Sequence, residues 1–325
     1  MFSSCESLEE VDVSGFHTAN VTTMAGMFLG CKKLISFGKK GLSDWDTGAV
    51  NNMYALFYNC EALKNVDVSN WNTGKVKDMG LMFRFCKSLE ELDVSRWDTQ
   101  SVNKLNLTFA DCSSLKRIDV SKWKTDNATT TYGLFYKCSS LSSLGEDGVG
   151  AWNTGKITDM SFMFRDCGNL TSLGENSVSG WKTGAVTNMA EMFLNCRKLQ
   201  TIDVSGWDTS GVDNMGWMFK GCKSLTSLDV SRFDTGKVIN MASMFEGCEK
   251  LESLDVSGWN TENVGLIPED KADNNEYKGS MVNMFKDCSS LTSLGETGVS
   301  SWKISDKAST SGMFTGTIWE DNPPI

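Results

Sequence analysis

The segment Val212-Asp-Asn-Met-Gly-Trp-Met-Phe-Lys-Gly-Cys-Lys-Ser-Leu-Thr-Ser-Leu-Asp-Val-Ser231 is the unit from which nearly all of this 325-residue chain is built. Its recurring frame reads Val-x-x-Met-x-x-Met-Phe-x-x-Cys-x-x-Leu-x-x-Leu-Asp-Val-Ser-x-Trp-Asp-Thr. The cysteines of the frame lie at Cys5, Cys31, Cys60, Cys86, Cys112, Cys138, Cys167, Cys196, Cys222, Cys248 and Cys288. Six of the ten steps between them are 26 residues long, three are 29 and one is 40.

A period of this length is typical of solenoid proteins, because one such unit cannot bury its apolar residues alone and must stack on its neighbours. We therefore predict one domain over residues 1–325, with about eleven full coils and a degenerate twelfth. In each coil, alternation such as that of Leu228, Asp229 and Val230 predicts one short parallel strand. The spacing of Val212, Met215, Phe219 and Cys222 predicts a short helical or 3₁₀ turn with one apolar stripe facing inward.

The signature Met-Phe-x-x-Cys-x-x-Leu-x-x-Leu-Asp-Val-Ser-x-Trp-Asp/Asn-Thr resembles the 26-residue repeat of bacterial surface proteins, a relative of the BspA-type leucine-rich repeats. The resemblance extends over essentially the whole chain. It implies a right-handed, leucine-rich-repeat-like coil in secreted, wall-attached or lipid-anchored proteins that serve as adhesins. It does not identify a ligand, because the repeated residues are those of the core.

Several segments depart from the repeat. Four coils are lengthened, near residues 37–45, 144–152, 173–181 and 294–302, where glycine permits a turn or bulge. The largest departure is a 14-residue insertion, which we predict to protrude as a loop over about residues 265–279. The tail, residues 315–325, is interpreted as a closing cap or the start of a linker. Met1 occupies the Met-Phe position of a coil, so we interpret it as an internal methionine, with any signal or anchor outside this sequence.

Two rows of aspartates are candidate binding residues, because parallel coils place equivalent side chains about 4.8 Å apart. The rows are Asp67, Asp93 and Asp119, and Asp203, Asp229 and Asp255. They are interpreted as solvated, hydrogen-bonded rungs, with weak calcium binding as the alternative. No calcium-loop spacing is present, so we predict no metal and no cofactor.

The second set of candidates consists of large apolar residues before the second Met of Met-x-x-Met-Phe, namely Leu81, Leu107, Phe162 and Trp217. If they are exposed, they form an interrupted stripe suited to a partner, and if they are buried, they belong to the core. The third set lies in the insertion and comprises Pro268, Glu269, Asp270 and Tyr277. The insertion is interpreted either as a recognition element or as a segment that the fold merely tolerates.

The cysteines and threonines of the frame are interpreted as structural. Eleven cysteines cannot pair fully and show no Cys-x-x-Cys motif, so we predict reduced thiols buried in the stack. The regular row of threonines is interpreted as turn chemistry rather than as an ice-binding face, because Asp/Asn-Thr-Gly is a turn signal.

Composition and motifs exclude several functions. The single histidine, His17, lies in a turn, and no nucleophile motif or phosphate loop is present, so we predict no enzyme. A net charge of −10 argues against binding to nucleic acid or to anionic membranes, and no segment is suited to membrane insertion. We predict an extracellular, cell-surface binding scaffold for a protein or glycan of a host or neighbouring cell. The alternative is a structural stalk or filament subunit that self-associates through uncapped ends.

Overall fold

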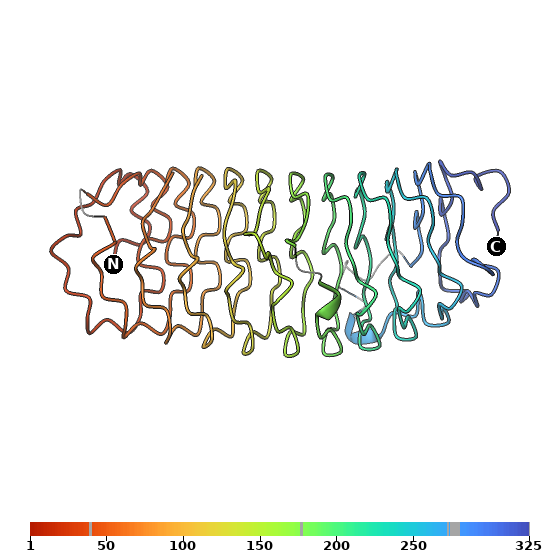
Figure 1. The fold of residues 1–325 in the computed structure, drawn as a ribbon, viewed down its shortest axis with the longest axis horizontal. Helices are drawn as coiled ribbons and strands as arrows, with labels where there is room; N and C mark the ends of the chain where they lie inside the picture. The colour runs from red at the N-terminus through yellow and green to blue at the C-terminus, as the bar shows by residue number, and fades with distance from the viewer. Residues whose placement is uncertain (39–40, 176–177, 272, 274–279, 325) are drawn as a thin grey trace. The chain divides into compact units, whose positions relative to one another are not determined.

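The computed structural model describes residues 1–38, 41–175, 178–271, 273 and 280–324. The chain divides into two compact units. Unit 1 comprises Met1–Lys156 and Leu173–Asn176, and unit 2 comprises Ile157–Ser172 and Ser177–Ile325. Within each unit, successive turns of the chain lie side by side as the coils of a repeat solenoid (Figure 1), as predicted.

Neighbouring coils pair through isolated parallel bridges rather than through extended strands. One row of bridges passes through the residue before the first Met, as in Asn188, Asn214 and Asn240. A second row passes between the two leucines, as in the bridge from Thr201 to Ser227. The predicted short strand is therefore reduced to a single bridge, because the chain turns again within a few residues on either side.

The predicted helical or 3₁₀ turn is a run of β-turns. The amides of Met218 and Cys222 donate to the carbonyls of Met215 and Phe219, three residues earlier, at 3.3 and 3.1 Å. The left-handed φ of 58° at Trp217 prevents this segment from continuing as a helix. In the described residues, 3₁₀ helices occur only at η1 (Val178–Gly180), in a lengthened coil before Trp181, and at η2 (Glu269–Lys271), in the insertion, so neither lies in the Met-Phe segment.

The backbone hydrogen bonds between coils in the Met-Phe segment run in one direction. The amides of Met215 and Trp217 donate to the carbonyls of Asn240 and Ala242 in the next coil, at 3.0 and 2.7 Å. Phe219 and Gly221 continue the series at 2.9 and 2.7 Å, and unit 1 has the same pattern from Met79 to Phe85. We call the surface formed by this segment the left-handed face, because two residues in each coil have positive φ, as at Trp217 and Gly221.

Aromatic side chains stack along the core of each unit. In unit 2, phenylalanine rings from Phe164 to Phe314 stack with centroids 5.6–5.9 Å apart. In unit 1, tryptophan rings from Trp45 to Trp152 stack at 6.2–6.4 Å. The indole N–H of each buried tryptophan needs an acceptor, and Trp97 Nε1 finds one in the Val68 carbonyl of the preceding coil at 3.1 Å.

The cysteines are buried and free, as predicted, except for Cys5, which is exposed. Each buried thiol lies against the backbone of the preceding coil. For example, Cys86 Sγ donates to the Phe57 carbonyl at 3.1 Å. The thiols therefore satisfy their donors without forming disulfides.

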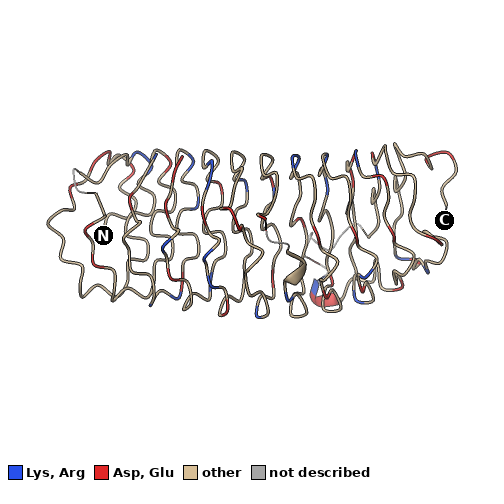
Figure 2. Cartoon of the chain, in the orientation of Figure 1, with Lys and Arg blue, Asp and Glu red and all other residues tan. Residues whose placement is uncertain are grey.

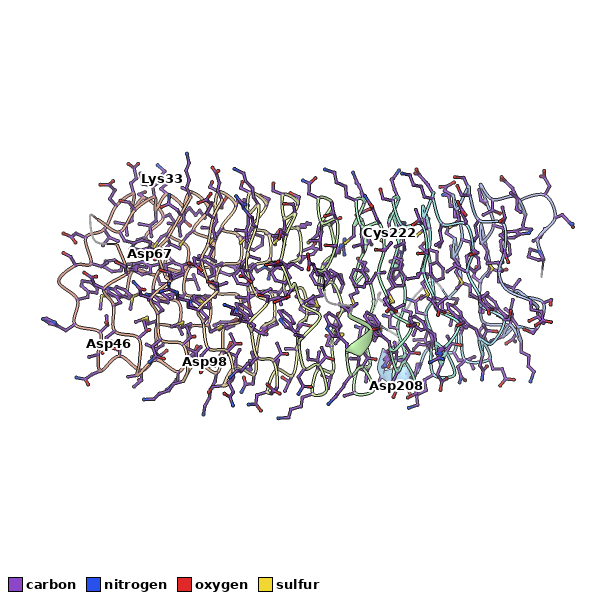
Figure 3. All side chains as sticks on the ribbon, in the orientation of Figure 1. Lys33, Asp46, Asp67, Asp98, Asp208 and Cys222 are labelled. Atoms are coloured by element: carbon purple, nitrogen blue, oxygen red, sulfur yellow. The ribbon has the colours of Figure 1, made fainter. Side chains whose placement is uncertain are left out.

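The Asp/Asn-Thr turns combine two roles. The Asp or Asn side chain closes the turn, as in Asp98, whose Oδ1 accepts the Gln100 amide at 3.0 Å. Figure 3 labels two equivalent turns, at Asp46 in unit 1 and at Asp208 in unit 2. The threonine itself is buried, and Thr73 Oγ1 donates to the Asp98 carbonyl of the next coil at 2.9 Å. Turn chemistry thus explains the Asp or Asn, whereas the threonine links coils inside the stack.

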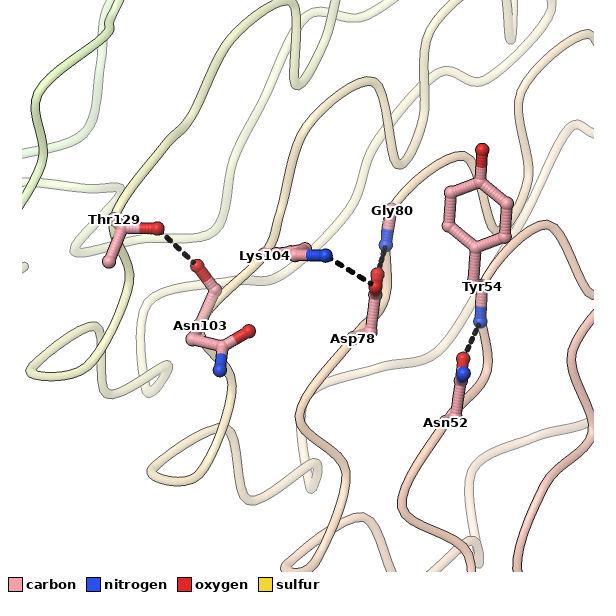
Figure 4. Close-up of polar contacts among 7 residues, drawn as sticks. All are labelled: Asn52, Tyr54, Asp78, Gly80, Asn103, Lys104 and Thr129. Atoms are coloured by element: carbon pink, nitrogen blue, oxygen red, sulfur yellow. Dashed lines mark hydrogen bonds and ion pairs between the residues drawn. The ribbon is translucent and has the colours of Figure 1, made fainter.

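The residue before the first Met closes a second turn in unit 1 (Figure 4). Asp78 Oδ1 accepts the Gly80 amide at 2.9 Å, and Asn52 Oδ1 accepts the Tyr54 amide at the same distance. Lys104 Nζ lies 3.4 Å from Asp78 Oδ2 and so pairs with the neighbouring coil. Polar side chains of the frame therefore support the turns locally and leave the core apolar.

Candidate functional site

The two aspartate rows close turns at the surface. Asp93 Oδ1 accepts the Ser95 amide at 3.0 Å and the Ser95 hydroxyl at 2.7 Å. The hydroxyl bond, followed by the backbone bond, lowers the pKa of Asp93 below its usual value. The same serine contacts occur at Asp67, Asp119, Asp203 and Asp229.

Hydrogen bonds to the serine two residues later therefore explain why aspartate recurs at this place of the coil. In unit 2, Asp255 accepts the Ser257 amide at 3.0 Å, which continues the row. In the part of the chain that the structure describes, no group of three His, Cys, Asp or Glu residues is placed to hold a metal ion. Acidic and basic residues are interspersed along the coils of both units (Figure 2).

A groove of about 420 Å³ lies over part of the unit 1 row, and we call it the strand-side groove. Its charged lining residues are Glu90, Glu91, Asp93, Lys116, Arg117 and Asp119. Lys116 Nζ pairs with Glu90 Oε2 at 2.8 Å, which raises the pKa of the lysine and lowers that of the glutamate. The structure thus places Asp93 and Asp119 together in a groove, whereas Asp67 lies in the coil before it.

The lengthened coil at residues 144–152 shapes one end of the strand-side groove. Gly145 occupies the place that Asp93 and Asp119 hold in the preceding coils, and its φ is 100°. A Cβ at Gly145 would lie 2.3 Å from Asp119 Oδ1, so only glycine lets the chain approach this closely. As a result Asp119 is half-buried, whereas Asp93 is exposed.

The four large apolar residues share one unusual backbone conformation. Leu81, Leu107, Phe162 and Trp217 have φ between 56° and 60° and are all half-buried. In unit 1, Leu107 lies across Gly133, where a Cβ would meet its Cδ2 at 2.5 Å. In unit 2, the Arg165 guanidinium lies 5.3 Å from the centre of the Phe162 ring. The four side chains are therefore neither fully exposed nor part of the core, and Leu107 covers the neighbouring coil.

The described part of the insertion folds back onto unit 2 rather than projecting freely. The Gly265 amide donates to the Ile239 carbonyl at 2.9 Å, and Lys271 in η2 pairs with Asp213. These contacts hold the start of the segment against two earlier coils. Pro268, Glu269 and Asp270 are exposed, and Tyr277 lies outside the described residues.

The tail packs on the last coil of unit 2. Glu320 Oε2 accepts the Gly316 amide at 3.1 Å, and the Trp319 ring meets the Phe314 ring edge-on with centroids 6.0 Å apart. Among the described residues, no helix has the length and apolar character needed to cross a bilayer.

A group of aromatic residues on the surface of unit 1 was not predicted from the sequence. Four of the five tyrosines lie on the left-handed face of unit 1, and Tyr54, the most exposed of them, is 41% exposed. Tyr58 meets Phe85 edge-on at 5.6 Å, and the Arg84 guanidinium lies 4.7 Å from the centre of the Phe85 ring. The signal was available in the spacing of the tyrosines, because Tyr54, Tyr58, Tyr132 and Tyr136 repeat at two fixed places of the coil.

The fold is a leucine-rich-repeat-like solenoid, and its surface carries a groove large enough for a ligand. The family model described as "Mycoplasma protein of unknown function, DUF285" matches residues 1–93, 34–146, 64–168, 140–228, 170–278 and 228–319. The chain belongs to this family, which confirms the resemblance seen in the repeat signature. No curated protein matches the chain.

Several solved structures are similar to this chain. A leucine-rich repeat protein from Bacteroides ovatus ATCC 8483 is 17% identical over 95% of this chain and 74% of that chain, with a TM-score of 0.38. A leucine rich cell surface protein from Faecalibacterium prausnitzii A2-165 is 19% identical over 84% of each chain, with a TM-score of 0.27. An internalin from Listeria monocytogenes is 13% identical over 96% of this chain and 86% of that chain, with a TM-score of 0.25.

Proposed function

We propose that this protein is a non-enzymatic, adhesin-like scaffold at the cell surface, which binds a protein or glycan of a host or neighbouring cell. The observation that carries the proposal is the strand-side groove of unit 1. Its volume of about 420 Å³ lies within the range of about 300–1,000 Å³ that is usual for ligand sites in proteins. Lys116 and Arg117 stand beside four carboxylates in it, so it offers both donors and acceptors to a polar partner.

The repeat supports a binding role because the core and the surface are set by different residues. Leu92 and Ile118 are buried, whereas their sequence neighbours Glu91, Asp93 and Arg117 are exposed. Outward residues can therefore change without disturbing the stack, which is how repeat solenoids build extended binding surfaces.

The test removes charge from the groove without disturbing its turns. In Asp93→Asn/Asp119→Asn the amide oxygen can still accept the serine amide, so the fold should persist. Full-length protein, fluorescently labelled, is applied to host-cell panels and to a glycan array. We expect at least a tenfold loss of binding for this variant and no loss for Asp203→Asn/Asp229→Asn, which makes the matched change in unit 2.

Two results would contradict the proposal. One is binding no stronger than background on every cell type and every glycan for the unchanged protein. The other is an equal loss in the two double variants, because the effect would then not belong to the groove.

A structural stalk or filament subunit is the second candidate. The one-directional backbone hydrogen bonds of the left-handed face favour it, since on this face the carbonyls of any coil complement the amides of the coil before it. The Glu320 carboxylate on the Gly316 amide opposes it by occupying one such donor. Light scattering over a hundredfold range of protein concentration separates the candidates, because a filament subunit grows in mass and a monomeric adhesin does not.

A further inference from the structure

A second groove lies on the left-handed face of unit 2, where two consecutive coils carry glycine. The residue before each frame cysteine has positive φ, and Asn195, Gly221, Gly247 and Asp287 hold this place with φ of 59°, 71°, 73° and 58°. Because asparagine and aspartate adopt the same conformation in neighbouring coils, the backbone does not require glycine at Gly221 and Gly247. What the glycines contribute is the absence of side chains, and a groove of about 400 Å³ lies over them.

The fold has room for a side chain at Gly247. A Cβ there would meet no atom closer than the Gly221 Cα at 3.7 Å, which is an ordinary contact. A Cβ at Gly221 would lie 2.6 Å from Asn195 Oδ1, at the end of a side chain. The open floor is therefore not imposed by packing at Gly247. We call this site the glycine groove.

Two parallel ion pairs form the walls of the glycine groove. Lys220 Nζ lies 2.8 Å from Glu246 Oε2, Lys223 Nζ lies 2.6 Å from Glu249 Oε1, and all four residues line the groove. Each lysine is thus matched by a glutamate from the next coil, so the charges of the walls cancel. All four residues retain some exposure, from 15% for the Glu246 side chain to 51% for Lys223.

The floor of the groove cannot bind an extended peptide by strand addition. The Gly221 amide donates to the Glu246 carbonyl at 2.7 Å, and the Gly247 amide donates to the Lys286 carbonyl at 2.8 Å. Since these amides are already used, recognition must come from the side chains of the walls and ends. The lining residues include no aromatic or large apolar side chain that would anchor a peptide.

We propose that the glycine groove binds a neutral oligosaccharide lying over Gly221 and Gly247. A charged ligand would have to break ion pairs that already neutralise each other, whereas a neutral polyol can use them as they stand. Sugar hydroxyls can donate to Glu246 and Glu249 and accept from Lys220 and Lys223, so a Lys–Glu pair suits neighbouring hydroxyls. Asp287 adds an acceptor at one end. This site is separate from the strand-side groove and does not depend on the function proposed for it.

Saturation-transfer NMR with the full-length protein tests the proposal. The probes are four neutral tetrasaccharides: cellotetraose, maltotetraose, mannotetraose and chitotetraose. We expect transfer to at least one of them, and a fall of at least tenfold in affinity for Gly247→Asn, which fills the floor with a side chain that the left-handed conformation accepts. Gly30→Asn is the matched control, because Gly30 holds the same place in unit 1 with φ of 75° and a Cβ there would meet nothing closer than 3.5 Å.

Several outcomes would overturn the inference: transfer to none of the four probes, equal affinity in Gly247→Asn with an unchanged circular dichroism spectrum, or preference for an anionic tetrasaccharide. Glu249→Gln, which leaves the floor open and removes one acceptor charge, replaces Gly247→Asn if that variant fails to fold, and it is expected to weaken binding. Asp93→Asn/Asp119→Asn should bind the saccharide normally. Failure at one groove is therefore distinguishable from failure at the other.

Discussion

At the scale of single residues, the main feature is the set of residues with left-handed φ. A residue other than glycine in this conformation costs about 1–2 kcal/mol, yet Leu81, Trp217 and Ala55 all adopt it. The conformation persists because it turns the amide of that residue toward the next coil, where the Trp217 amide makes a bond of 2.7 Å. Stacking therefore offsets a local strain that recurs along the chain.

Replacing Ala55 with glycine tests this strain. Ala55 is 1% exposed with φ of 54°, and Ala110 in the same unit is fully buried without positive φ. Both alanine-to-glycine changes remove one buried methyl, worth about 0.8 kcal/mol, but only Ala55→Gly relieves a left-handed side chain. We expect Ala55→Gly to be more stable than Ala110→Gly by about 1–2 kcal/mol in urea denaturation. Equal destabilisation of the two variants would refute the argument.

At the scale of the coil, buried hydroxyls join one turn of the chain to the next. Thr99 Oγ1 donates to the Lys124 carbonyl at 3.0 Å and accepts the Lys124 amide at 2.7 Å. One side chain therefore satisfies both backbone polar groups of Lys124 in the next coil. Threonine recurs in nearly every coil because valine, although of similar size, can neither donate nor accept these hydrogen bonds.

Thr99→Val should consequently cost about 1–3 kcal/mol, since it leaves the Lys124 amide and carbonyl without their partner. Thr99→Ser is the control, because it keeps the hydroxyl and loses only a methyl, at about 0.8 kcal/mol. Thermal or urea denaturation of the two variants gives the comparison. A valine variant as stable as the serine variant would show that this hydroxyl does not hold the coils together.

The sequence predicts the coil well and its internal geometry less well. The spacing of Phe219, Cys222 and Leu225 identifies the core correctly, because burial depends on side-chain type and period. The conformation at Trp217 was not predictable, because tryptophan has no intrinsic preference for positive φ and adopts it only under the hydrogen bonds of the stack. The glycine groove was missed because glycines of a repeat normally indicate turns rather than open floors.

Across the molecule, the buried thiols are a chemically uniform set. Burial raises the pKa of Cys222 to about 12 and raises those of Cys112, Cys196 and Cys248 well above the ordinary value. An unfolded chain ionises its thiols near pH 8.5. The native state therefore holds these protons at alkaline pH when the unfolded state has released them.

Stability should be complete below about pH 8.5 and fall as the pH rises toward the folded-state values. Each such thiol contributes a slope of about 1.4 kcal/mol per pH unit between the two pKa values. Cys222→Ala should accordingly flatten the decline between about pH 9.5 and 11 by this amount, measured by urea denaturation at several pH values. Cys5→Ala, at the exposed cysteine, should leave the slope unchanged. An unaltered slope in Cys222→Ala would contradict the assignment.

Because successive coils make their backbone hydrogen bonds to one another at the same places of the repeat, a whole copy of 26 residues can be added or removed between two others with these donors and acceptors still matched. Gain or loss of one repeat in the gene is then a conservative event for folding. Natural variants of this gene should therefore differ in steps of 26 codons, so that the number of coils evolves faster than the chemistry of any single coil.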